Sequence, residues 1–183
     1  MNRMIIVMGL PGAGKSTVLR GIASDVKVLN YGTLMFEIAK EKFGIGDRDQ
    51  IRKLPVGQQR EVQAAVAERL SSEEGRVVLD THCSIKTPKG YLPGLPFELL
   101  SKLKVDGLVL ITAKPEEVFA RRGNDPSRDR KDDVTLEHVQ EHDSMNRSFL
   151  AAYAAHRGCP AKIIYNAQGK VDEASAELHR ILE

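Results

Sequence analysis

The sequence predicts an α/β protein in which one parallel sheet of five strands is flanked by helices, in three layers. Short apolar runs recur along the chain, and a stretch with helical periodicity separates each run from the next. The runs are rich in branched residues and lack the polar alternation of half-exposed strands, which is typical of strands covered on both faces. Strands and helices that alternate in this way, joined by right-handed crossovers, form a parallel sheet.

The apolar runs are the expected strands, at Met4–Met8, Lys27–Asn30, Val77–Asp80, Gly107–Thr112 and Lys162–Asn166. The expected helices lie between and after them, at Lys15–Ser24, Gly32–Phe43, Val56–Glu73, Pro96–Leu103, Pro115–Arg122, Val134–Arg157 and Val171–Leu182. Asp132 and Asp133 are candidate caps at the start of the long sixth helix, and Gly158 followed by Pro160 ends it. Two stretches rich in Gly and Pro are expected to be loops, at residues 87–96 and 123–131.

Length and composition suit a single domain, since the chain has 183 residues and a mass of 20.2 kDa. No apolar run reaches the length of a membrane span and no signal-peptide cleavage site follows the start, so a soluble, cytoplasmic protein without a membrane partner is expected. Cys83 and Cys159 lie far apart and predict neither a disulfide framework nor a zinc site. A formal charge of +2 and the absence of tryptophan argue against a nucleic-acid partner.

The strongest functional motif directly follows the first expected strand. Residues Gly9-Leu10-Pro11-Gly12-Ala13-Gly14-Lys15-Ser16 fit the pattern G-x-x-x-x-G-K-[ST]. Glycines permit a tight turn with positive φ, so that successive backbone N–H groups converge on phosphate oxygens at the start of a helix. Lys15 is expected to reach the β- and γ-phosphates of ATP, and Ser16 is expected to bind magnesium. The sequence therefore predicts a phosphate-binding loop.

Positive charge gathers in and beside the second expected loop, at Arg121, Arg122, Arg128, Arg130 and Lys131. Arg147 on the long helix is placed to fold back over this loop. Phosphoryl transfer depends on positioning and charge neutralisation, and arginine binds phosphate oxygens through a planar fork that stays charged. A solvated surface run of charges is the other interpretation of this segment, and the phosphate-binding loop in the same chain favours the catalytic one.

Asp80 ends the third strand and is expected to hold magnesium through water, with a carboxylate that caps the following turn as the alternative. His82 and Cys83 follow it, but neighbouring side chains on an extended segment point to opposite faces, so a nucleophilic pair is not expected. Arg52 and Lys53 stand at a helix start, where they form either a second anion site or a capped surface turn.

On these motifs the sequence resembles the archaeal-type adenylate kinases, a branch of the P-loop nucleoside monophosphate kinases, nearly from end to end. The resemblance is carried by residues 9–17, 30–35, 47–54, 80–96 and 128–132, and Leu-Asp-Thr-His and Gly-Tyr-Leu-Pro-Gly-Leu-Pro are its most discriminating pieces. It implies the magnesium-dependent reaction ATP + AMP = 2 ADP on a P-loop NTPase-type fold. It also implies an AMP-binding region at about residues 31–73, a short lid at about residues 122–132, and a homotrimer.

The resemblance further implies roles for single residues. The ATP side would consist of Gly9, Leu10, Pro11, Gly12, Ala13, Gly14, Lys15, Ser16, Thr17 and Arg121. A second set would line the AMP side, its last two members beside the AMP phosphate: Tyr31, Gly32, Arg52, His82 and Lys86. The catalytic set, which would neutralise the transferred phosphoryl group, consists of Lys15, Arg128, Arg130 and Arg147. Thr33 stands where the family often has Asp, and Lys86 stands where Arg is common.

Other functions stay open at the level of sequence. A kinase for CMP, UMP or GMP would share these motifs, because base choice depends on hydrogen bonds in the pocket. A kinase for the hydroxyl group of a small metabolite would need a carboxylate base, for which Asp80 and Asp49 are candidates. A nucleotide-dependent switch is the alternative from another class, and the loop arginines favour catalysis over it because they would shield the phosphoryl group from water.

Overall fold

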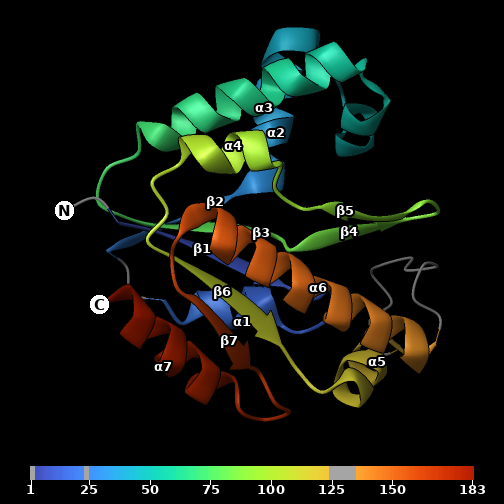
Figure 1. The fold of residues 1–183 in the computed structure, drawn as a ribbon, viewed down its shortest axis with the longest axis vertical. Coiled ribbons are helices and arrows are strands. Elements are labelled where there is room, and N and C mark those ends of the chain that lie inside the picture. The colour runs from blue at the N-terminus through green and yellow to red at the C-terminus, as the bar shows by residue number, and fades with distance from the viewer. Residues whose placement is uncertain (1–2, 23–24, 124–134) are drawn as a thin grey trace.

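The computed structural model describes residues 3–22, 25–123 and 135–183, and it confirms the predicted fold class (Figure 1). One sheet holds five parallel strands in the order β2–β3–β1–β6–β7. Their bounds are β1 Arg3–Gly9, β2 Val26–Asn30, β3 Arg76–His82, β6 Gly107–Thr112 and β7 Ala161–Tyr165. The central strand β1 pairs Gly9 with His82 of β3 and with Ile111 of β6. The loops after these three strands therefore leave the sheet at one edge, where ligands bind in open parallel sheets.

Helices cover both faces of the sheet (Figure 1). One face carries α2 (Tyr31–Phe43), α3 (Val56–Ser71), α4 (Phe97–Lys102) and α6 (Leu136–Arg157), and the other carries α1 (Lys15–Arg20) and α7 (Val171–Leu182). α5 (Pro115–Gly123) packs against α6, and the 3₁₀-helix η1 (Arg48–Lys53) lies between α2 and α3. No helix in the described part of the chain has the length and apolar character needed to cross a membrane.

The strands separate two apolar cores, because successive side chains of a strand point to opposite faces. In β1, Met4, Ile6 and Met8 belong to the core under α2, α3, α4 and α6. Ile5 and Val7 belong to the core under α1 and α7. Each of these side chains is buried, which explains why the strand has no polar alternation in its sequence.

The predicted helices occur, with some of their ends shifted. The first helix stops at Arg20, before the predicted end at Ser24, which lies outside the described residues. Gly21 follows it, and a Cβ on Gly21 would lie 2.8 Å from the Cβ of Ser175 on α7. The absence of a side chain at this position therefore lets α7 pack closely against the end of α1.

The predicted cap of the long helix is wrong. α6 begins at Leu136, and its cap is Thr135, whose side-chain oxygen accepts a hydrogen bond from the backbone N–H of His138 at 3.3 Å. The candidate caps Asp132 and Asp133 lie outside the described residues. Threonine is also a favoured cap residue, and it stands directly before the first helical turn.

Part of the segment predicted as a loop is a β-hairpin. β4 (Ser84–Thr87) pairs antiparallel with β5 (Gly90–Pro93), and the two strands project together from the sheet edge (Figure 1). Thr87 stabilises the turn: its hydroxyl donates to the carbonyl oxygen of Gly90 at 2.8 Å and accepts from the N–H of Lys89 at 3.2 Å. The Gly and Pro content suggested a loop, but both residues are compatible with a short two-stranded ribbon whose outer edges need no partner.

Gly94 fastens the end of this hairpin to the main sheet. Its backbone N–H donates to the carbonyl oxygen of Cys83 at 2.9 Å. A Cβ at this position would lie 1.9 Å from the carbonyl oxygen of His82, so the two backbone segments can approach only if residue 94 is glycine.

We expect Gly94→Ala to lower the free energy of unfolding by more than about 2 kcal/mol, because the added Cβ forces two packed backbone segments apart. Gly57→Ala is the matched control, since nothing lies within 4 Å of a Cβ at Gly57 in the first turn of α3. That change is expected to be neutral or to stabilise by up to about 1 kcal/mol. Urea unfolding followed by circular dichroism measures both variants. Equal stability of the two would contradict the close approach at Gly94.

Candidate active site

The phosphate loop (residues 9–16) forms the turn from β1 into α1 at the carboxyl edge of the sheet. Gly12 and Gly14 have φ angles of +89° and +80°, a conformation that side chains with a Cβ rarely adopt. A Cβ on Gly14 would also lie 2.4 Å from Nδ2 of Asn166. The apolar side chains of the loop are buried in a small core that includes residues of α5 and α6. The motif glycines are therefore required by backbone conformation and by space.

Side chains outside the phosphate loop hold it by its carbonyl groups. Asn166 Nδ2 donates to the carbonyl oxygen of Ala13 at 2.8 Å, and Arg122 Nε donates to that of Pro11 at 2.8 Å. Arg121 donates to the carbonyl oxygen of Asn166 at 3.0 Å and reaches that of Ala13 at 3.4 Å. Two permanent positive charges therefore lie against the loop, in addition to the partial positive charge of its backbone N–H groups.

Lys15 and Asp80 meet at the centre of this edge. Lys15 Nζ forms an ion pair with Oδ1 of Asp80, and each side chain is 13% exposed. The other carboxylate oxygen, Oδ2, accepts a hydrogen bond from Nδ2 of Asn30 at 2.9 Å. Ser16 and Thr17 follow Lys15 in the first turn of α1, where both are exposed. The structure thus brings together the predicted lysine and the predicted metal-binding carboxylate, and the two carboxylate oxygens of Asp80 bond to Lys15 and Asn30.

Arg147 on α6 is held in place by a partly buried polar network. Its Nε donates to Oδ2 of Asp143 at 2.8 Å, its Nη2 donates to the hydroxyl of Tyr165 at 3.2 Å, and its guanidinium lies 5.7 Å from the centre of the Tyr165 ring. Asp143 also accepts from the buried hydroxyl of Thr112 at 2.6 Å. Burial lowers the pKa of Arg147, but its bonds to Asp143 and Tyr165 outweigh that effect and raise the pKa, so the side chain stays charged.

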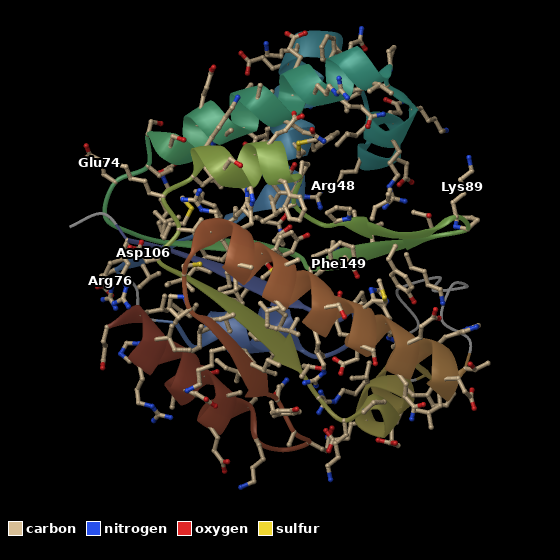
Figure 2. All side chains as sticks on the ribbon, viewed as in Figure 1. Arg48, Glu74, Arg76, Lys89, Asp106 and Phe149 are labelled. Atoms are coloured by element: carbon tan, nitrogen blue, oxygen red, sulfur yellow. The ribbon has the colours of Figure 1, made fainter. Side chains whose placement is uncertain are left out.

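The predicted AMP side lies at the start of α2. Tyr31 is the first helical residue, its side chain is buried, and burial raises the pKa of its hydroxyl far above the ordinary value. A Cβ on Gly32 would lie 3.9 Å from Nη1 of Arg48. Nη2 of Arg48 donates to the hydroxyl of Thr33 at 2.6 Å, so the guanidinium lies against the first turn of α2. In Figure 2, Arg48 lies below the uppermost helices and above the sheet.

Sequence reasoning did not name Arg48; it and Arg52, which stays a prediction for the AMP side, are both exposed. In the 3₁₀-helix η1, side chains three residues apart share a face. Arg48 therefore shares a face with Ile51, which packs against the main core, whereas Arg52 lies on another face. The available signal was Asp47, whose side chain caps η1 by accepting from the N–H of Gln50 at 3.1 Å and so fixes where the turn begins.

His82 and Cys83 follow β3 and differ in environment. His82 is exposed and pairs in register with Gly9 of the phosphate loop. Cys83 is fully buried, and its thiol donates to the carbonyl oxygen of Asn146 at 3.1 Å. Lys86 lies on β4 of the hairpin and is half-buried. Because His82 is exposed and Cys83 is buried, the two side chains do not form a nucleophilic pair, as the sequence predicts.

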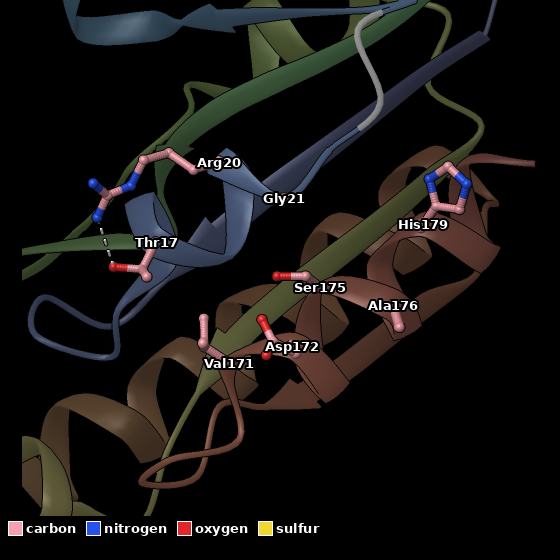
Figure 3. A pocket seen from close by; sticks show the side chains of 8 residues that line it. All are labelled: Thr17, Arg20, Gly21, Val171, Asp172, Ser175, Ala176 and His179. Atoms are coloured by element: carbon pink, nitrogen blue, oxygen red, sulfur yellow. Dashed lines mark hydrogen bonds between the residues drawn. The ribbon is translucent and has the colours of Figure 1, made fainter.

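Two hollows border the segment from β7 to α7. One, of about 590 Å³, lies between α1 and α7 and is lined by Thr17, Arg20, Gly21, Val171, Asp172, Ser175, Ala176 and His179 (Figure 3). The other, of about 450 Å³, is lined by Glu117, Ala120, Arg121 and Gln168. The predicted ATP residues Thr17 and Arg121 therefore each face a hollow. The predicted catalytic residues Arg128 and Arg130, and most of the predicted lid, lie outside the described residues.

Comparison with known proteins decides the family. A family model described as an AAA domain matches residues 8–140. An adenylate kinase from Thermoplasma volcanium is 44% identical over 180 residues, which cover 97% of this chain and 98% of the relative. The chain belongs to the adenylate kinase family. Adenylate kinases from Thermoplasma acidophilum and Methanothermobacter thermautotrophicus are 41% and 42% identical, cover 97% and 99% of this chain, and are themselves covered to 97% and 100%. The family resemblance of the sequence is thereby confirmed.

Solved structures with the same fold include two shikimate kinases. The enzyme from Bacteroides thetaiotaomicron has a TM-score of 0.60 at 14% identity and covers 100% of this adenylate kinase family member, with 99% of its own chain matched. The enzyme from Acinetobacter baumannii, solved with shikimate, has a TM-score of 0.57 at 19% identity, with 100% and 93% of the two chains covered. Similarity at this level of identity concerns the fold alone.

We expect Cys83 to resist thiol reagents in the folded protein. Burial raises the pKa of the Cys83 thiol to about 12, so roughly one molecule in ten thousand carries the reactive thiolate at pH 8. Cys159 is half-buried and should react first, although burial raises its pKa as well. Titration with Ellman's reagent at pH 8 should modify one thiol per native chain and the second only in denaturant. A Cys159→Ser variant should then show no native reactivity, and a rapidly reacting thiol in that variant would contradict the burial of Cys83.

Proposed function

We propose that the protein catalyses the reversible transfer of the γ-phosphoryl group of ATP to AMP, giving two ADP, with magnesium as the metal ion, and so balances adenine nucleotides. The observation that carries this proposal is the meeting of Lys15 and Asp80 beside the start of α2, in a chain that matches adenylate kinases over nearly its whole length. The reaction needs a phosphate-binding donor site and a cationic acceptor site at one sheet edge, and both features are supported by the described residues.

On the donor side, the phosphate loop would bind ATP through its backbone N–H groups. Lys15 would exchange its bond with Asp80 for oxygens of the β- and γ-phosphates. Arg121 lies against the loop and lines the hollow of about 450 Å³, which supports its proposed contact with the nucleotide. The carbonyl groups of the loop are bonded from outside, and this preorganised geometry favours phosphate binding.

Ser16 and Asp80 suit a magnesium ion that arrives with ATP. The described residues contain no group of three His, Cys, Asp or Glu side chains that would enclose a metal. Magnesium usually keeps several waters and is held by one or two protein groups together with substrate phosphates, which fits this set. When bound, the ion neutralises charge on the phosphates. Asp80, through water, and the Ser16 hydroxyl are the residues that would hold it.

On the acceptor side, AMP needs cations and no general base, because its phosphate is already largely ionised near neutral pH. The proposed set is Tyr31, Gly32, Arg52, His82 and Lys86. Arg48 extends it, since its guanidinium lies against the first turn of α2. Asp80, one of the two candidate bases for a hydroxyl acceptor, is assigned to magnesium in this proposal and is held by Asn30, which argues against its use as a base.

Arg147 would neutralise charge on the transferred group together with Arg128 and Arg130, which stay predictions from the family resemblance. The contacts of Arg147 with Asp143 and Tyr165 fix its guanidinium near the carboxyl ends of β6 and β7. The homotrimer likewise stays a prediction from the resemblance, and the cytoplasmic location stays a prediction from the sequence.

The reaction itself is tested by incubating the purified protein with magnesium and ATP plus AMP, CMP, UMP, GMP or no acceptor, and separating the products by chromatography. We expect AMP to give two ADP for each ATP consumed. Preference for another monophosphate would support phosphoryl transfer to a monophosphate but would show that the acceptor base is not adenine. Equal phosphate release with and without an acceptor would contradict a kinase and favour an ATPase or a switch.

Lys15→Met is expected to lower kcat by at least about 10²–10³-fold, because it removes a cation from the phosphate site. The fold is expected to stay intact, because the apolar core is unchanged. Lys104→Met is the matched control, since Lys104 is exposed just before β6, at the opposite edge of the sheet. Steady-state rates measure the effect, and circular dichroism checks the fold. Near-normal turnover of Lys15→Met would refute the site assignment.

A further inference from the structure

Asn30 bonds to both sides of the proposed site: to the start of α2 on the acceptor side and to Asp80 on the donor side. It is the last residue of β2, it precedes the first residue of α2, and its register partner in β3 is Asp80. Its Oδ1 accepts hydrogen bonds from the backbone N–H of Thr33 at 2.9 Å and from the Thr33 hydroxyl at 3.1 Å. Its Nδ2 donates to Oδ2 of Asp80 at 2.9 Å. One amide group therefore caps the acceptor-side helix and fixes the donor-side carboxylate.

The orientation of this amide is determined by its partners. The backbone N–H of Thr33 can only donate, so the group that faces it must be the amide oxygen. The Asp80 carboxylate can only accept when it is ionised, so the group that faces it must be the amide NH₂. A serine, threonine or aspartate at position 30 would provide the cap without the bond to Asp80, whereas asparagine provides both.

The chain of bonds continues beyond Asn30 in both directions. Arg48 donates to the Thr33 hydroxyl at 2.6 Å, and that hydroxyl in turn donates to Asn30. At the other end, Lys15 forms its ion pair with the second oxygen of Asp80. Donation runs toward Asp80 from both ends, since its carboxylate accepts from Asn30 and from Lys15, so an unbroken path of bonds joins the arginine of η1 to the lysine of the phosphate loop.

We propose that Asn30 is a positioning residue that couples the two substrate sites, a proposal that rests on the proposed function. A donor phosphate that draws Lys15 away from Asp80 changes the charge that Asn30 faces. An acceptor phosphate that draws Arg48 away from Thr33 changes the other end of the same path. Because binding effects between two sites are reciprocal, each substrate then alters the affinity of the other by the same factor.

The test separates this coupling from a simple capping role. Asn30→Ser keeps a side-chain acceptor for the N–H of Thr33 but is too short to reach Asp80. Isothermal titration calorimetry gives the Kd of the acceptor monophosphate alone and with saturating magnesium and a non-hydrolysable ATP analogue. We expect the two Kd values to differ by at least about fivefold in the original protein and to become nearly equal in Asn30→Ser. We also expect kcat to fall by about tenfold, with a smaller change in the KM of each substrate.

The matched control is Thr135→Ser, which changes the cap of α6, a helix that carries no residue of the path. It should retain the original ratio of Kd values. If Asn30→Ser keeps that ratio and loses only thermal stability, Asn30 is a cap and the proposal is wrong. If Asn30→Ser does not fold, Asn30→Asp carries the test, because it keeps the cap and sets a second carboxylate against Asp80.

The acceptor in this titration is the monophosphate that the product assay selects. If that assay selects a monophosphate whose base is not adenine, the acceptor in the proposed function changes. The coupling test is then carried out unchanged with that monophosphate. Equal Kd values in the original protein would overturn the coupling while the enzyme still turns over. Absence of turnover with every monophosphate would overturn both proposals.

Discussion

The parallel register of β1 with its two neighbours is the constraint on which the site depends. Gly9, His82 and Ile111 stand at one level in adjacent strands, so the phosphate loop, the hairpin and the segment that enters α5 leave the sheet together. Such a sheet must bury both faces, and the alternating side chains of β1 meet this requirement by entering two cores. Polar side chains then gather where the strands end, and the ion pair of Lys15 and Asp80 avoids the full desolvation that it would suffer within the core.

The phosphate loop is held by its surroundings rather than by its own short helix. Residues of α5 and of the segment after β7 bond its carbonyl groups, and the side chain of Asn166 occupies the space that a Cβ on Gly14 would need. Arg121 and Arg122 lie in the last turn of α5, where the predicted lid begins. Both donate to carbonyl oxygens of the phosphate loop, so these bonds hold the last turn of α5 against that loop.

The sequence predicts what is local and misses what is distant. The strands, the helices and the phosphate loop follow from apolar periodicity and from one contiguous motif, and the structure agrees with them. The Gly and Pro content of the hairpin predicts a loop, because it does not reveal the turn on which the pairing of β4 with β5 depends. Arg48 and Asn30 were missed because their partners lie 15 and 50 residues away in the chain. Local patterns carry no information about bonds of that kind.

In the proposed function, the cations of the site have different partners on the donor side and on the acceptor side. The cations proposed for the donor and for the transferred group are bonded to carboxylates: Lys15 to Asp80, Arg121 to Glu117, and Arg147 to Asp143. In the proposed function a nucleoside triphosphate draws Lys15 away from Asp80, which a polyanion does more readily than a singly charged solute, while Asp143 keeps Arg147 in place. Arg48 on the acceptor side is instead bonded to the neutral hydroxyl of Thr33. In the proposed function, a monophosphate, with less charge to offer, would compete there with a weaker partner, and the two substrates would be distinguished by the strength of the bonds that each must replace.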